Sequence, residues 1–157
     1  MATQSFFQVF LLLHLIGFIL FIGTSITDFV TLNQFWKQYS QDKDKSLAVL
    51  QAMAKFPTLM GIGFGVIILS GVGMMAITHG VIGEQLWFRI KFGILIAIII
   101  TRIIGRRQGK NLKGLLAGTS NENTEEIKIV KRKLTLFHFA QLIMLFSIII
   151  LSVFKFN

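Results

Sequence analysis

The chain contains no cysteine and only one proline. The lack of thiols excludes disulfides, thiolate metal sites and thiol redox chemistry. Acidic residues are also few, with seven Asp and Glu against 16 Lys and Arg in 157 residues, so the formal net charge is +9. Apolar side chains, by contrast, make up 54% of the sequence. The class of protein therefore depends on how the charged and the apolar residues are distributed along the chain.

Four nearly uncharged runs organise the chain. A helical run of about 20 apolar residues is long enough to cross the ~30 Å hydrocarbon core of a bilayer. The runs cover about residues 6–28, 57–79, 86–104 and 134–154. They predict an all-α fold, an integral membrane four-helix bundle with antiparallel up-down helices. We expect one membrane domain over residues 1–157.

The basic residues are distributed unevenly between the connections. Four follow the first run and nine lie in or beside the connection at about 105–133, whereas the other side has only Arg89, Lys91 and Lys155. The first and third connections of a four-span protein share a face, and the positive-inside rule makes that face cytoplasmic. Both termini are then on the outer side of a bacterial inner (cytoplasmic) membrane, which the chain crosses as a multi-pass protein. The basic stretch is interpreted as a topology and anionic-lipid signal, with the lipid bilayer and not nucleic acid as partner.

The structure of the segments between the runs can also be predicted. The first helix is expected to continue through Tyr39, and residues 46–56 have the apolar spacing of a helix that leads into the second span. Pro57 suits the first turn of that span. The connection at 105–133 is predicted to be a mobile loop because of its Gly, Ser and Asn content, with Asn123 or Thr124 capping a helix that begins at residue 125.

The second run is the richest in glycine. Gly61 and Gly65 form a small-xxx-small pair, and Gly73 with Ser70 or Gly71 extends the small surface. Small residues allow helix backbones to approach closely in lipid. Two interpretations are compatible with this pattern, close helix packing and space for a flat ligand between helices.

His14 is the deepest ionisable group of the first run. It lies about 12 Å from the outer boundary, near the midplane. At about 100° per residue it shares a helical face with Phe7, Phe21, Ser25 and Asp28, and this face is expected to point inward. Three roles are open for His14. It is a neutral histidine that donates to a carbonyl of a neighbouring helix, a ligand of a metal or haem, or a proton relay.

The third run has basic residues near both ends. Lys91 lies about 7 Å from the outer boundary, so it is within one side chain's reach of His14 in depth. Its amine either extends outward to the interface or takes part in a site. Arg89 and Arg102 are interpreted as interface anchors.

The two other histidines are poor partners for His14. His138 begins the fourth run from the inner side, about 12 Å or more from His14 along the membrane normal. A His14–His138 pair on one metal therefore has unfavourable geometry, because bonds from imidazole to metal are only about 2 Å long. His79, at the outer end of the second run, is interpreted as a flanking loop residue.

The chain resembles a superfamily that includes the membrane-bound bacterial protoporphyrinogen oxidase and the copper-resistance D-like proteins. The resemblance is carried by His14 in "LHLIGF", by Gly23, by the Trp87 to Lys91 spacing that opens the third run, and by the ending "LSVFKF". It implies that His14 is the metal ligand of a haem and that Lys91 is a catalytic and cofactor-binding residue. This chain departs from the family at Phe21, where a tryptophan is usual, and at Asp28, where the family has a basic residue.

These observations lead to three hypotheses from different functional classes. The first is a b-type haem-associated redox protein, with haem b as cofactor, a quinone or porphyrin as partner, and His14, Phe21 and Lys91 at the cofactor. Lys91 is then a second ligand if neutral, or pairs with a haem propionate if charged. The second is a small transporter or channel, assembled as a homo-oligomer, in which a polar path is lined by His14, Ser25, Thr27 and Asp28 and His14 relays protons. The third is a scaffold that binds partner helices through its glycine surface.

Overall fold

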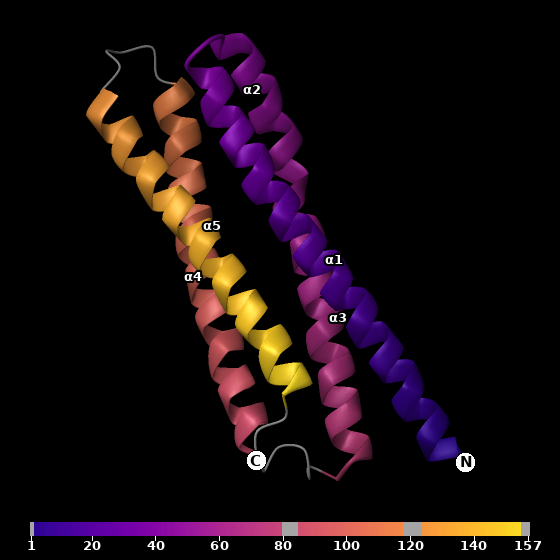
Figure 1. Ribbon diagram of the computed structural model, residues 1–157. Coiled ribbons are helices and arrows are strands. Elements are labelled where there is room, and N and C mark those ends of the chain that lie inside the picture. The colour runs from indigo at the N-terminus through magenta and orange to yellow at the C-terminus, as the bar shows by residue number, and fades with distance from the viewer. Residues whose placement is uncertain (1, 80–84, 118–123, 155–157) are drawn as a thin grey trace. The chain divides into compact units, whose positions relative to one another are not determined.

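A computed structural model describes residues 2–79, 85–117 and 124–154, and every regular element among them is helical (Figure 1). The elements are α1 (Ala2–Tyr39), α2 (Lys43–Ala52), the short 3₁₀ helix η1 (Met53–Lys55), α3 (Phe56–Ile77), α4 (Leu86–Ala117) and α5 (Thr124–Val153). The prediction of an all-α fold is confirmed for this part of the chain.

The chain divides into two compact units. The first is Met1–Arg89 with Phe156–Asn157, and the second is Ile90–Lys155. α1, α2 and α3 lie in the first unit, and α5 with most of α4 lies in the second. The single four-helix domain expected from the sequence stays a prediction.

α1 and α3 pack against each other in the first unit. Phe10 lies against Gly73 near one end of the pair, and Ser25 contacts Met60 further along. Residue numbers therefore rise along α1 as they fall along α3, so these two helices run in opposite directions (Figure 1). Pro57 lies in the first turn of α3, as predicted, where its missing N–H costs little.

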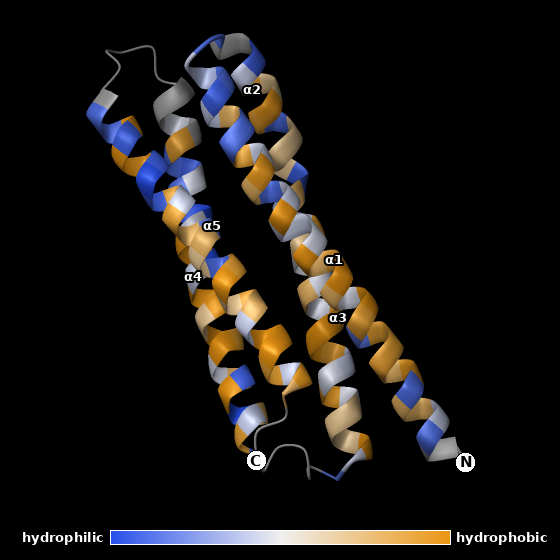
Figure 2. Ribbon diagram, in the orientation of Figure 1, coloured by the Kyte–Doolittle hydropathy of each residue, from blue (hydrophilic) through white to orange (hydrophobic). Residues whose placement is uncertain are grey.

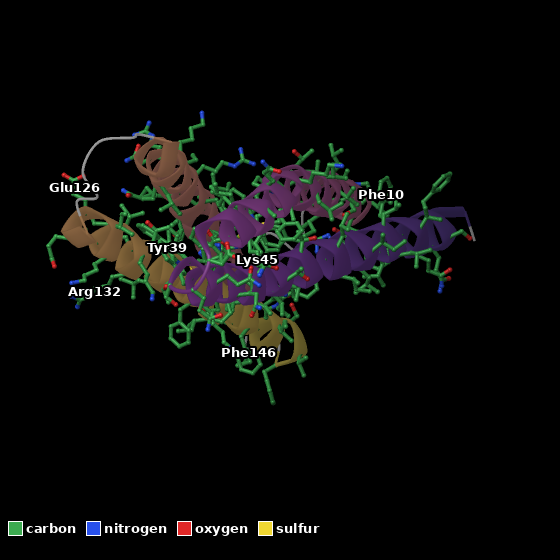
Figure 3. The ribbon with its side chains drawn as sticks, turned by 90° about the horizontal axis from the view of Figure 1, so that it is seen from above. Phe10, Tyr39, Lys45, Glu126, Arg132 and Phe146 are labelled. Atoms are coloured by element: carbon green, nitrogen blue, oxygen red, sulfur yellow. The ribbon has the colours of Figure 1, made fainter. Side chains whose placement is uncertain are left out.

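A tight turn connects α1 to α2. The amides of Gln41 and Asp42 donate to the carbonyl of Gln38 at 2.9 and 2.8 Å and end α1. Asp42 then caps α2, because its carboxylate accepts from the Lys45 amide at 3.2 Å. Tyr39 and Lys45 lie near this turn, and Phe10 lies toward the opposite end of α1 (Figure 3). The helix predicted through Tyr39 is confirmed.

Buried side chains are few in both units. In the first unit the turn is supported by an aromatic cluster in which the Phe35 ring centroid lies 4.8 Å from that of Trp36 and 5.9 Å from that of Tyr39. Many large apolar side chains are exposed instead, for example Leu69 on α3 and Ile19 on α1. Exposed apolar surface of this extent is typical of a protein that is covered by lipid or by partners.

Within the described residues, three helical segments are long and apolar enough to cross a membrane. They are Gln4–Tyr39, Lys45–Ile77 and Glu125–Val153. In Figure 2 the parts of α1 and α3 that pack together are mostly orange, whereas α2 and the adjoining end of α1 also carry blue. These segments indicate a membrane-associated protein.

α4 differs from the other long helices in its charges. Arg89, Lys91 and Arg102 interrupt its apolar part, and the uncharged stretch, 92–101, has only ten residues. A helix of ten residues is about 15 Å long, half the thickness of the hydrocarbon core. Among the described residues α4 is not one of the candidate spans. The predicted third crossing, at 86–104, therefore remains a proposal.

The connection predicted as a loop from residue 105 is partly helical. α4 continues to Ala117, and α5 begins at Thr124. The prediction was wrong for 105–117, because adding a residue to an existing helix costs far less than starting one. Gly105, Gly109 and Gly114 are each less favourable than alanine by about 1 kcal/mol, but strong helix formers surround them. The helix expected from residue 125 is confirmed, and Asn123, one of its two predicted caps, lies outside the described residues.

Candidate functional site

His14 extends from α1 onto the backbone of α3. Its Nδ1 lies 3.0 Å from the carbonyl oxygen of Ile67 and 3.0 Å from Oγ of Ser70. Ser70 is buried, with 2% of its surface exposed. The expectation that the His14 face points toward a neighbouring helix is met. This contact also corresponds to one of the three roles open for His14, that of a neutral histidine that donates to a carbonyl of a neighbouring helix.

The contacts of Nδ1 assign the tautomer of the ring. A carbonyl oxygen only accepts, so the contact with Ile67 places the proton of a neutral ring on Nδ1. The Ser70 hydroxyl lies 2.6 Å from the carbonyl of Val66 and donates its single proton there. Its oxygen can then accept from Nδ1–H. The lone pair of the neutral imidazole is consequently on Nε2. A metal ligated by His14, or a proton relayed by it, would bind at this nitrogen.

The backbones of α1 and α3 come very close one turn from His14. A Cβ placed on Gly17 would lie 2.9 Å from the carbonyl oxygen of Gly63 and 3.0 Å from the amide nitrogen of Ile67. A Cβ on Gly63 would lie 3.0 Å from the oxygen of Gly17 and from the nitrogen of Phe21. This contact fixes the separation of the two helices at the level of the imidazole, and it leaves no space between them for a flat ligand.

Two further small residues of α3 accommodate side chains of α1. The His14 ring lies over Gly71, since a Cβ there would be 3.7 Å from its Cε1. The Phe10 ring fills the space at Gly73, where a Cβ would be only 2.5 Å from it. At these positions the small surface serves close packing, the first of its two interpretations.

The Gly61 and Gly65 pair does not contact α1. A Cβ on either glycine would meet nothing within 4 Å. Within the first unit this pair therefore does not serve close helix packing, one of the two interpretations of the glycine surface. The contact uses Gly17 and Gly63 instead.

Three hydroxyl groups in the middle of α1 donate to carbonyls of their own helix. Thr24 and Ser25 donate to the carbonyls of Leu20 and Phe21 at 2.7 and 2.8 Å. Thr27 does the same four residues back, at 2.9 Å. This is how Ser and Thr commonly satisfy their protons within apolar helices. Ser25 also contacts the sulfur of Met60 at 3.9 Å, and Asp28, one turn further along α1, is half-buried.

Phe21 is enclosed by the first unit. It is 2% exposed, and its ring centroid lies 5.7 Å from that of Phe64. Its backbone meets Gly63 at the closest approach of the two helices. In the first unit Phe21 thus holds the packing beside His14, and its contact with a cofactor stays a prediction.

Lys91 and His138 belong to the second unit, whereas His14 belongs to the first. Lys91 is half-buried in α4, and Arg102 is half-buried eleven residues later. The carbonyl oxygen of Leu134 lies 2.8 Å from Nδ1 of His138 in the same helix. Because a carbonyl oxygen only accepts, the Nδ1–H of His138 donates to it. Any meeting of Lys91 with His14 stays a prediction.

His79 lies two residues after the last residue of α3, Ile77. It has φ +50°, it is exposed, and its amide donates to the carbonyl of Ala76 at 3.3 Å. A residue in this left-handed conformation commonly terminates a helix. The interpretation of His79 as a flanking residue agrees with this placement.

The structure brings together two site residues, His14 and Ser70, whose pairing the sequence analysis missed. No three His, Asp or Glu side chains gather into a metal-binding group in the part of the chain that the structure describes. No family model, curated protein or solved structure matches the chain.

Proposed function

We propose that the chain is an integral membrane protein that binds a b-type haem through Nε2 of His14 and takes part in electron transfer. The observation that supports this is the hydrogen bonding of the other ring nitrogen. A histidine that ligates a metal almost always donates its second N–H to a carbonyl, a carboxylate or water, which fixes the tautomer and the ring orientation. Ile67 and Ser70 supply this arrangement at 3.0 Å each.

A single oriented imidazole suits haem better than a bare ion. Structural and catalytic zinc sites need three or four protein ligands, whereas haem iron takes one or two axial ligands from the protein. The Gly17–Gly63 contact closes the space between α1 and α3 beside His14. The haem is therefore proposed on the side of His14 that faces away from α3.

The remaining roles follow from the residue chemistry and the resemblance. Haem would supply the one-electron chemistry, with a quinone or a porphyrin as the redox partner. The ammonium group of Lys91 would pair with a propionate, a role that needs only its ordinary charged form. The α1–α3 contact would hold His14 in place.

The proposal includes a topology. We place the chain in a bacterial inner membrane, crossing it four times in an up-down bundle with both termini outside. The basic residues of 102–133 then face the cytoplasm, as the positive-inside rule requires. For α4 to cross, Lys91 must extend toward one interface and Arg102 toward the other, because the 92–101 stretch alone is too short.

The absorption spectrum of the purified full chain tests the haem. Protein from cells supplied with a haem precursor is expected to show an intense Soret band. His14→Gly should abolish the band, and added imidazole should restore it by occupying the vacated ligand position. His138→Gly is the matched control, because that imidazole also donates its Nδ1–H to a helix carbonyl. It should leave the band unchanged.

Two results would overturn the proposal. One is colourless wild-type protein from haem-supplemented cells. The other is a Soret band that survives His14→Gly, with helix content confirmed by circular dichroism. Colourless protein that moves ions in proteoliposomes, with flux lost in Asp28→Asn, would support the transporter hypothesis in its place.

A further inference from the structure

The Nδ1 atom of His14 meets two acceptors of α3 that differ in kind. The carbonyl oxygen of Ile67 and Oγ of Ser70 each lie 3.0 Å from it. Ile67 offers a backbone oxygen, which every residue type has. Ser70 offers a side-chain oxygen, so this half of the contact depends on the amino-acid sequence. Ser70 is therefore the acceptor that a substitution can remove.

The proton of the Ser70 hydroxyl points away from His14. Its Oγ lies 2.6 Å from the carbonyl oxygen of Val66 and 3.1 Å from that of Ile67. Both carbonyl oxygens only accept, so the single hydroxyl proton goes to one of them and Oγ offers a lone pair to Nδ1–H. A hydroxyl that donates is a better acceptor, because hydrogen bonds in a chain polarise one another. The bonds from Ser70 to the backbone of α3 thus strengthen its bond with the imidazole.

The backbone beside Ser70 also restricts the plane of the imidazole ring. The ring lies over Gly71, where a Cβ would be 3.7 Å from Cε1 and 3.8 Å from Nδ1. A ring with a single hydrogen bond can still rotate about that bond, whereas two acceptors and a backbone surface limit the rotation. Ser70 is buried, so bulk water has little access to its place. The hydroxyl of Ser70 therefore contributes to the direction in which Nε2 points.

We infer that Ser70 is a positioning residue for His14, whose hydroxyl oxygen orients the imidazole and increases the electron density that Nε2 offers to a haem iron. This inference rests on the proposed function. Hydrogen-bond acceptors at the second nitrogen of a ligating histidine fix its orientation and raise its basicity. A more basic axial ligand favours the ferric over the ferrous state, and such hydrogen bonds are one means by which a protein tunes haem. Ser70 accordingly lowers the midpoint potential.

Redox titration of the purified full chain tests this role. Ser70→Ala should keep the Soret band, because His14 and the Ile67 carbonyl remain, but should move the midpoint potential to a more positive value. Loss of one acceptor should also weaken haem binding by about tenfold. Thr24→Val is the matched control, since it too removes a buried hydroxyl that donates to the carbonyl four residues back, at 2.7 Å. It should change neither quantity.

A second readout does not need haem. In ¹⁵N NMR of the histidine-labelled full chain prepared without haem, the His14 signals are assigned by their absence in His14→Gly. They should show the proton on Nδ1. Ser70→Ala should shift the Nδ1 resonance because this nitrogen loses an acceptor, whereas Thr24→Val should leave it in place.

The possible failures separate this inference from the proposed function. A wild-type Soret band together with an unchanged midpoint potential in Ser70→Ala would reject the role of Ser70 and leave haem binding by His14 standing. An unchanged Nδ1 resonance in Ser70→Ala would reject it as well. Equal shifts in Ser70→Ala and Thr24→Val, with helix content verified by circular dichroism, would assign the effect to packing in general. Colourless wild-type protein would overturn the proposed function and this inference together.

Discussion

At the scale of single residues, Gly17 and Gly63 determine where His14 can lie. Each lies so close to the backbone of the other helix that an added methyl group would clash with it. His14 is three residues from Gly17, so the same close approach brings its Nδ1 to the Ile67 carbonyl. These two glycines, which have no functional side chain, therefore determine the position of the His14 ring relative to α3.

Gly17→Ala should separate α1 from α3 and destabilise the packing of these two helices. The new Cβ would be 2.9 Å from a backbone oxygen, which cannot move as a side chain can. Overpacking of this kind costs about 1–3 kcal/mol, and it should appear as a lower midpoint of thermal unfolding in detergent. Gly65→Ala adds the same methyl to open space and should leave the midpoint unchanged or raise it. Equal effects of the two substitutions would contradict the packing described here.

The individual residues of the site were predictable to different degrees. His14 could be found from the sequence because an imidazole in an apolar run is costly and therefore conspicuous. Its partner Ser70 was recognised only as a small residue, because the pairing depends on the register of α1 against α3. The Gly61 and Gly65 pattern was misleading for the same reason, since spacing shows that two glycines share a face but not which helix that face meets.

At the scale of elements, α1 and α4 are much longer than the apolar runs that predicted them. α1 has 38 residues and α4 has 32, so they are about 57 and 48 Å long. The hydrocarbon core takes about 30 Å. The runs could be predicted because a long apolar stretch is conspicuous in a sequence, whereas the extent of a helix beyond such a run depends on weaker local preferences. Residues 105–117 were assigned to a loop on composition, although the preceding helix supplied the nucleus for their folding.

The start of α2 depends on its cap. Asp42→Ala removes the side-chain oxygen that accepts from the Lys45 amide at 3.2 Å and should cost about 1 kcal/mol. Faster hydrogen exchange at the amide of Lys45 would report the loss. Asp42 also forms an ion pair with the Lys45 ammonium at 3.1 Å, but this pair is well exposed and contributes little. Asp42→Asn keeps the cap without the charge and should preserve the protection; exchange as fast as in Asp42→Ala would assign the effect to the ion pair.

At the scale of the whole molecule, α4 decides the topology. The described part of the chain contains three candidate spans by length and composition, and α4 is the helix whose charges divide its apolar part. If α4 crosses with Lys91 and Arg102 extended toward opposite interfaces, the termini lie on the same side of the membrane. If it does not cross, they lie on opposite sides. Composition alone could not decide between these cases, because the cost of a charge near an interface depends on whether its side chain reaches water.

Single-cysteine labelling separates the two topologies, and the natural absence of cysteine makes every introduced thiol the only one. With four crossings, a membrane-impermeant maleimide added to spheroplasts should label Gln4→Cys, His79→Cys and Asn157→Cys. Ser40→Cys and Lys110→Cys should react only after the membrane is opened with detergent, which also serves as the reactivity control. With three crossings, Lys110→Cys would react from outside and Asn157→Cys would not. The reversal of those two positions, with Gln4→Cys unchanged, would reject the four-span arrangement and with it a transmembrane position for Lys91.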